Sequence, residues 1–104
     1  MTSMNNYQDF TRTTAIYPKI KAKEYTLLGL SGEVGEVCNA AKKEIRDNAP
    51  PSPNMTKELG DVLWYLARVA DEYGIQLEQV AQKNIEKLSQ RKNRGTIGGS
   101  GDDR

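Results

Sequence analysis

The chain has 104 residues, a formal net charge of +1, 37% hydrophobic and 28% charged residues, and no histidine. This length predicts one small domain, and the near-zero charge argues against duplex nucleic acid or an anionic membrane as a partner. Without histidine, the sequence excludes His-based acid–base catalysis, His-ligated zinc and di-iron bundles built on Glu-x-x-His motifs. The single cysteine, Cys38, leaves no intrachain disulfide. We see neither a secretion signal nor an apolar run of about 20 residues, so a cytoplasmic location is expected.

Four helices and a tail are predicted, in chain order. The expected helices span roughly residues 6–16, 21–47, 55–73 and 76–92. Pro18 ends the first helix or starts a turn after it, and three prolines forbid helix between Asn48 and Asn54. Asn54 is expected to cap the third helix, and Gly74 is a natural residue to follow its end.

The helices are predicted to form one domain over residues 1–94, followed by a glycine-rich tail over residues 95–104 that its composition predicts to be flexible. No segment alternates as a strand does, so the predicted fold class is all-α. Long amphipathic segments joined by short loops indicate an antiparallel bundle of about four helices. Because the chain is polar for a globular domain, some apolar surface is expected to be buried only in a homo-oligomer.

Each predicted helix carries an apolar stripe with steps of three and four residues, expected to face the core. The stripes comprise Tyr7, Phe10, Thr14 and Tyr17 in the first helix; Leu27, Leu30, Val34, Cys38, Ala41 and Ile45 in the second; Leu59, Val62, Leu63, Leu66, Ala70 and Tyr73 in the third; and Leu77, Val80, Ala81, Ile85 and Leu88 in the fourth.

Two hexapeptides are near copies of each other: Gly-Glu-Val-Gly-Glu-Val over residues 32–37 and Lys-Glu-Leu-Gly-Asp-Val over residues 57–62. Each places two carboxylates three residues apart, Glu33 with Glu36 and Glu58 with Asp61, so that each pair shares one side of its helix. The helical wheel puts Glu33 and Glu58 at the edge of the core. If the two helices pack together, four acids converge, and their repulsion requires a cation. Mg²⁺, which prefers oxygen ligands, is the predicted ion, with Mn²⁺ as the alternative.

Glycines accompany the acids. Gly29, Gly32 and Gly35 recur in the second predicted helix, and Gly60 lies inside the third. Each costs about 1 kcal/mol relative to alanine in a helix interior. Their presence predicts that a neighbouring element or a ligand approaches the helices closely here.

The pattern Glu33-x-x-Glu36, 21 residues, then Glu58-x-x-Asp61, with Leu30-Ser-Gly before it and Val62-Leu-Trp-Tyr-Leu66 after it, resembles the signature of MazG-like nucleoside triphosphate pyrophosphohydrolases. The resemblance covers roughly residues 25–94. It implies an all-α enzyme that cleaves nucleoside triphosphates to the monophosphate and pyrophosphate. It also implies that the four acids hold magnesium and that dimers or tetramers form, in which neighbouring subunits complete the site.

Candidates for substrate binding follow on the fourth predicted helix, where Asn84, Lys87 and Arg91 stand at i, i+3 and i+7. Asn84 falls near the middle of the apolar stripe, where it is either a hydrogen-bonded core residue or part of the metal site. Lys87 and Arg91 are either solvated cations or phosphate ligands. The resemblance favours the functional alternative for all three.

Three further candidates lie on the other helices. Lys43, next to Lys42, either reaches the phosphates or is a solvated cation near a helix end. Trp64 points away from the predicted stripe and either stacks on a base or, as we prefer, packs at a subunit interface. Gln8 on the first helix either contacts the base, for which it offers both a donor and an acceptor, or packs on the bundle.

The predicted reaction is metal-assisted hydrolysis between the α- and β-phosphates of a nucleoside triphosphate. Without histidine, a carboxylate must take the proton from water, and Glu36, the outer acid of its pair, is the predicted base. Two alternatives remain open: a helical protein-interaction module without chemistry, and a non-catalytic nucleotide sensor that keeps the acids only for binding.

Overall fold

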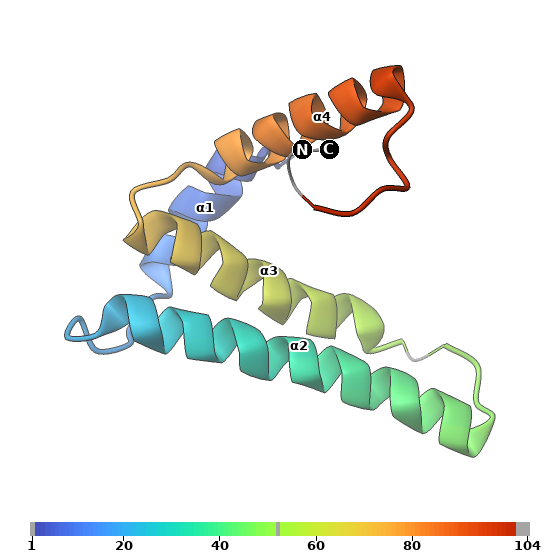
Figure 1. The fold of residues 1–104 in the computed structure, drawn as a ribbon. Helices are drawn as coiled ribbons and strands as arrows, with labels where there is room; N and C mark the ends of the chain where they lie inside the picture. Colours follow the sequence, from blue (N-terminus) through green and yellow to red (C-terminus); the bar gives the residue numbers. More distant parts are fainter. Residues whose placement is uncertain (1, 52, 102–104) are drawn as a thin grey trace.

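The computed structural model describes residues 2–51 and 53–101, and over these ranges it contains four α-helices and no strand. They are α1 (Met4–Thr13), α2 (Ala22–Asp47), α3 (Met55–Glu72) and α4 (Leu77–Arg94), as Figure 1 shows. The all-α prediction is confirmed, and the first and last residues of each predicted helix lie within three positions of those observed. Ser52 of the proline loop and residues 102–104 of the tail lie outside the described residues.

Local sequence signals account for several helix ends. Ser3 caps α1, because its Oγ accepts the N–H of Asn6 at 3.1 Å. Gly74 follows α3 with φ +70°, and the Ile75 N–H donates to the Ala70 carbonyl at 2.8 Å, which closes the helix as predicted. Asn54 is the N-cap residue of α3, as predicted, although its side chain makes no capping hydrogen bond.

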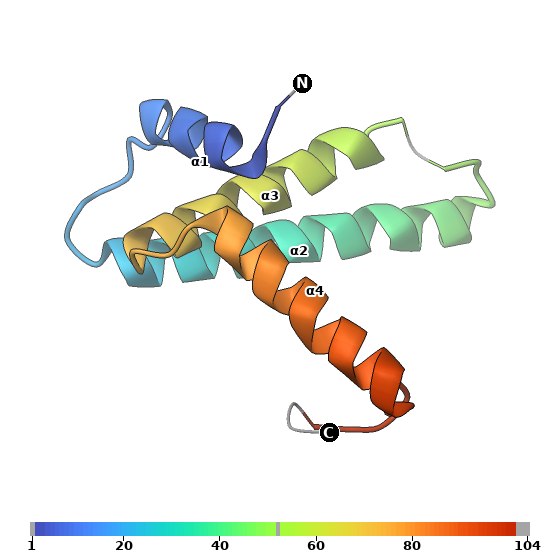
Figure 2. The ribbon, with the colours of Figure 1, turned by 90° about the horizontal axis from the view of Figure 1, so that it is seen from above.

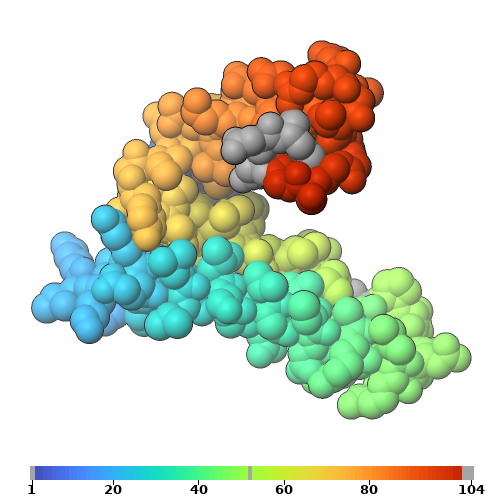
Figure 3. Space-filling model, viewed as in Figure 1, coloured from blue at the N-terminus to red at the C-terminus, as the bar shows by residue number. Residues whose placement is uncertain are grey.

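The helices α2 and α3 form an antiparallel hairpin, which is the largest contact in the chain. The short helix α1 lies on α3. Helix α4 contacts both α1 and α3 but has no contact with α2. Figures 1 and 2 show α4 running away from the hairpin, and the space-filling view leaves an open hollow between α4 and the far half of the hairpin (Figure 3). Four helices are present as predicted, but the predicted antiparallel bundle is not completed within a single chain. None of the helices in the described part of the chain is long and apolar enough to cross a membrane.

Because α4 diverges, most of the predicted apolar stripes are not covered. The buried hydrophobic residues among those described are Ala67, Ala70 and Leu77. Large apolar side chains of the predicted stripes are instead exposed, among them Leu27, Val34 and Ile45 on α2, Leu59 and Leu66 on α3, and Val80, Ile85 and Leu88 on α4. Of the predicted stripe residues, Ala70 and Leu77 are buried as expected, but most of the large apolar ones are exposed, because α4 does not pack against α2.

A polar network, rather than the predicted apolar face, joins α1 to α3. The buried residues of α1 are Gln8 and Thr11, while Phe10 is exposed. Thr11 Oγ1 accepts from Arg68 Nη1 at 3.3 Å, and the same nitrogen donates to Asp71 Oδ2 at 3.0 Å. Hydrogen bonds from Arg12, whose Nε lies 3.0 Å from both Asp71 oxygens, hold the pKa of Asp71 below its usual range. These bonds fix α1 along the carboxyl-terminal half of α3.

Candidate metal centre

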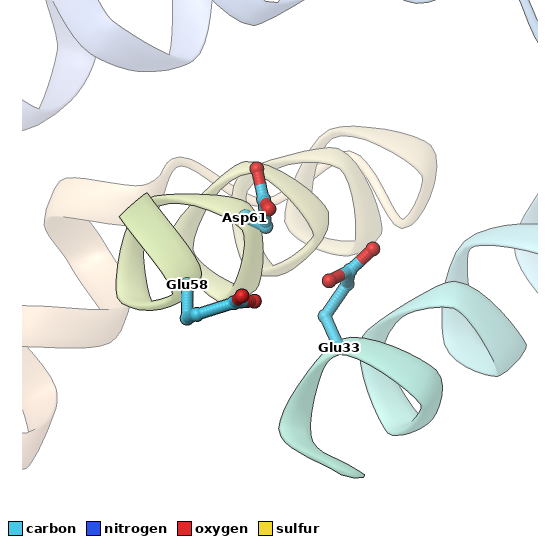
Figure 4. Close-up of side chains that lie close together, drawn as sticks. All are labelled: Glu33, Glu58 and Asp61. Carbon is cyan, nitrogen blue, oxygen red and sulfur yellow. The ribbon is translucent and has the colours of Figure 1, made fainter. Parts of the chain in front are cut away.

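Three carboxylates gather where α2 and α3 pack side by side. Glu33 of α2 faces Glu58 and Asp61 of α3, and one oxygen of each lies within 4.8 Å of the others (Figure 4). Glu33 and Glu58 are half-buried and Asp61 is exposed. The helical-wheel prediction that Glu33 and Glu58 lie at the edge of the core is confirmed. We call these three residues the acid group.

The electrostatics of the acid group favour a cation. The pKa of Glu33 is raised, first by partial burial and then by the negative charges of Asp61, Glu58 and Glu36. Like charges this close destabilise one another unless a counter-charge lies between them. The donor set contains only carboxylate oxygens drawn from two rigid helices. That chemistry suits a hard divalent ion such as Mg²⁺ or Mn²⁺.

Glu36 lies beside the acid group but is not part of it. Its side chain is exposed, one helical turn beyond Glu33. It lines an open pocket of about 480 Å³, which α2 and the proline loop enclose. Lys43 of α2 and Glu58 of α3 line the same pocket, so the structure brings a predicted phosphate ligand close to two of the predicted acids.

The candidates on α4 are not brought to the acid group within one chain, because α4 has no contact with α2 and diverges from α3 (Figure 2). Asn84 is exposed, so the alternative that it is a hydrogen-bonded core residue is not observed. Lys87 is half-buried, and Arg91 is 4% exposed, with its Nη2 donating to the Gly101 carbonyl at 3.3 Å. Arg91 is thus engaged with the carboxyl-terminal tail.

Gln8 has a structural role that its sequence position did not reveal. It is 3% exposed; its Nε2 donates to the Ile75 carbonyl at 2.9 Å, and its Oε1 accepts the N–H of Leu77, the first residue of α4, at 2.8 Å. Its amide therefore joins α1 to the α3–α4 turn, and the predicted contact with a base is not available to it. The second alternative for Gln8, packing on the bundle, is the one observed.

Trp64 packs within its own chain. Its indole N–H donates to Thr14 Oγ1 at 2.8 Å, and its ring meets Tyr17 and Tyr65 edge-on at 6.3 and 4.9 Å between centroids. Trp64 lies off the predicted stripe of α3, but the segment after α1 folds over that side of the helix and covers it. Neither base stacking nor a subunit interface is needed to explain it.

The charges of the acid group act on two tyrosines that were not predicted as site residues. Burial and the charge of Asp61 raise the pKa of Tyr7. Burial, followed by interactions that include the charges of Glu33 and Asp61, raises the pKa of Tyr65. The spacing of Tyr65, four residues after Asp61 on one helix face, was the available signal.

The described residues thus form a helical protein in which α2 and α3 bring three carboxylates together. This group is a candidate centre for a hard divalent ion. Residues 21–96 match the family described as the MazG nucleotide pyrophosphohydrolase domain, so the chain belongs to that family. It is also 41% identical to "Gene 37 protein" of Mycobacterium phage L5 over 109 aligned residues, which cover 94% of this chain and 96% of the phage protein. No solved structure matches the chain significantly.

Proposed function

We propose that the chain is a Mg²⁺-dependent nucleoside triphosphate pyrophosphohydrolase that cleaves a ribo- or deoxyribonucleoside triphosphate to the monophosphate and pyrophosphate. The observation that carries the proposal is the acid group itself, three carboxylates from two helices within 4.8 Å of one another. Membership of the MazG family supports the same reaction class.

Glu33, Glu58 and Asp61 would hold the metal, since their oxygens already converge. The bound ion supplies charge neutralisation at the phosphates and acidifies a water molecule. Mn²⁺ fits the same oxygen donors and is the alternative ion.

Glu36 is the proposed general base, and a fourth metal ligand if its side chain turns toward the acid group. Its place outside the three converging carboxylates leaves it accessible to a water molecule in the adjoining pocket. Lys43, in the same pocket, provides a positive charge that attracts a phosphate oxygen. The pocket volume of about 480 Å³ falls within the range of small-molecule sites.

The apolar surfaces left open on α3 and α4 support assembly as a homodimer or homotetramer. In such an assembly, Asn84 and Lys87 would serve the site of a neighbouring subunit, because α4 does not reach the acid group of its own chain. A cytoplasmic location and the absence of a nucleic-acid partner remain our predictions.

A pyrophosphate-release screen of the common nucleoside triphosphates, with and without Mg²⁺, tests the function. We expect Mg²⁺-dependent pyrophosphate release by the unchanged chain and a loss of at least about 100-fold for Glu58→Gln, since oriented charge at phosphates supplies most of the catalysis. Glu24→Gln is the matched control, because Glu24 is an exposed acid on α2 that is not in the acid group.

Three results would contradict the proposal. Release of inorganic phosphate would indicate cleavage at the wrong anhydride. Equal loss in Glu24→Gln and Glu58→Gln would dissociate turnover from the acid group. Stabilisation by nucleotide and Mg²⁺ without any product would identify a nucleotide sensor instead.

A further inference from the structure

A side chain of α3 lies close against the backbone of α2 at Gly29, one turn before Glu33 of the acid group. The ring of Tyr65 lies against the backbone of α2 at this glycine. A Cβ atom added to Gly29 would lie 2.5 Å from Cζ and 2.6 Å from Cδ1 of that ring, far inside van der Waals contact. By contrast, a Cβ at Gly32, Gly35 or Gly60 would meet nothing within 4 Å, so nothing in the chain's own packing explains these three glycines.

The contact is in register with the acid group. Gly29 precedes Glu33 by four residues, and Tyr65 follows Asp61 by four residues. Because α2 and α3 run antiparallel, the Gly29–Tyr65 contact lies one helical turn from the place where Glu33 meets Asp61. The Tyr65 ring and the space left by the missing side chain of Gly29 therefore set the separation and rotation of α2 and α3 at the acid group.

The Tyr65 ring is held from a second side as well. The Trp64 ring meets it at an interplanar angle of 84° with centroids 4.9 Å apart, and Trp64 is itself anchored by its hydrogen bond to Thr14. A side chain on Gly29 thus has two outcomes: the helices separate, or the ring leaves its place and disturbs this aromatic group. Either outcome moves Glu33 relative to Glu58 and Asp61.

We propose that Gly29 and Tyr65 form a positioning pair that sets the geometry of the acid group for its divalent ion. The positioning is assigned to the ring of Tyr65, which lies against Gly29, whereas its hydroxyl shares a hydrogen bond with Tyr25. This inference rests on the proposed function, since it assumes that the acid group binds a metal.

The test measures Mn²⁺ affinity by electron paramagnetic resonance, at a temperature at which each variant is folded, and does not require turnover. We expect Gly29→Ala to weaken Mn²⁺ binding about 10- to 100-fold, the usual effect of disturbing groups that orient metal ligands. Gly32→Ala is the matched control on the same helix and should change the affinity by no more than about threefold. Light scattering on both variants shows whether assembly has changed.

Variants of Tyr65 keep the proposal testable even if Gly29→Ala fails to fold. Tyr65→Phe retains the ring and should bind Mn²⁺ as the unchanged chain does, whereas Tyr65→Leu should lose about tenfold or more. In the Tyr65→Leu background, adding Gly29→Ala should cost no more than about threefold, because the overlap has been removed.

Equal Mn²⁺ affinities in Gly29→Ala and Gly32→Ala would overturn the positioning role. So would an equal loss of Mn²⁺ affinity when Gly29→Ala is added to the unchanged chain and to the Tyr65→Leu variant. A lower melting temperature with unchanged Mn²⁺ affinity would show that the pair is merely structural and would also overturn it. If the unchanged chain binds no Mn²⁺, the proposed metal centre and this inference both fail, whereas Mn²⁺ binding without pyrophosphate release contradicts the proposed function alone.

Discussion

Replacing Glu33 with glutamine should stabilise the metal-free chain and remove its stabilisation by divalent ions. Two like charges within 4.8 Å of each other repel by about 1 kcal/mol in water-like surroundings, and Glu33 has two such partners, Glu58 and Asp61. After partial screening by salt, Glu33→Gln should raise the free energy of unfolding by about 1–2 kcal/mol at low ionic strength. For a domain of this size, each 1 kcal/mol corresponds to about 4–8 °C in melting temperature.

The assay is thermal unfolding followed by circular dichroism at one fixed protein concentration, first with EDTA and then with increasing Mg²⁺. The unchanged chain should gain stability as Mg²⁺ rises, and Glu33→Gln should not. Glu24→Gln, on the same helix outside the acid group, should stay within about 0.5 kcal/mol of the unchanged chain in EDTA and should respond to Mg²⁺ as the unchanged chain does. Destabilisation of the EDTA-treated chain by Glu33→Gln, or a Mg²⁺ response in this variant equal to that of the unchanged chain, would refute the predicted repulsion among the acids.

Three further predictions concern the α1–α3–α4 junction. Asp71→Asn should lower the free energy of unfolding by about 1–3 kcal/mol at pH 7. Because the folded-state pKa of Asp71 is depressed, its stabilisation is present above its unfolded pKa of about 4 and is lost as pH falls through the depressed value. In urea titrations, the difference in unfolding free energy between Asp71→Asn and the unchanged chain should therefore be smaller at pH 3 than at pH 7. Gln8→Leu should cost about 2–4 kcal/mol in urea unfolding, because it leaves the Leu77 N–H and the Ile75 carbonyl without their partner; a loss under 1 kcal/mol would contradict this role. Gly74→Ala should lower the urea midpoint by the equivalent of about 1–2 kcal/mol without changing the slope, since φ is +70° there; an unchanged midpoint would refute the argument.

Local sequence signals predicted the elements well. The prolines before α3 and Gly74 after it mark the two ends of this helix, because they act through their own backbone preferences. The wheel position of Glu33 and Glu58, at the edge of an apolar stripe, also held, since helix geometry is the same wherever the helix packs.

The sequence did not reveal what each stripe packs against. The apolar face of α4 has the same pattern whether it covers its own α2 or another chain, so the divergence of α4 could not be inferred. Gln8 shows the same limit, because its burial depends on a turn 67 residues away in the chain. Gly29 was correctly suspected of a close contact, but only the structure distinguishes it from Gly32 and Gly35.

The connection between α2 and α3 has a consequence for how the metal and the fold depend on each other. Between Glu33 and Glu58 the chain runs out along α2, around the proline loop and back, and a shared ion would act as a removable cross-link across that excursion. An ion that binds only the folded chain stabilises it by an amount that grows with the ratio of free ion concentration to dissociation constant. The concentration of free divalent ion would then set the stability of the α2–α3 hairpin, much as redox conditions set the stability of a loop closed by a disulfide.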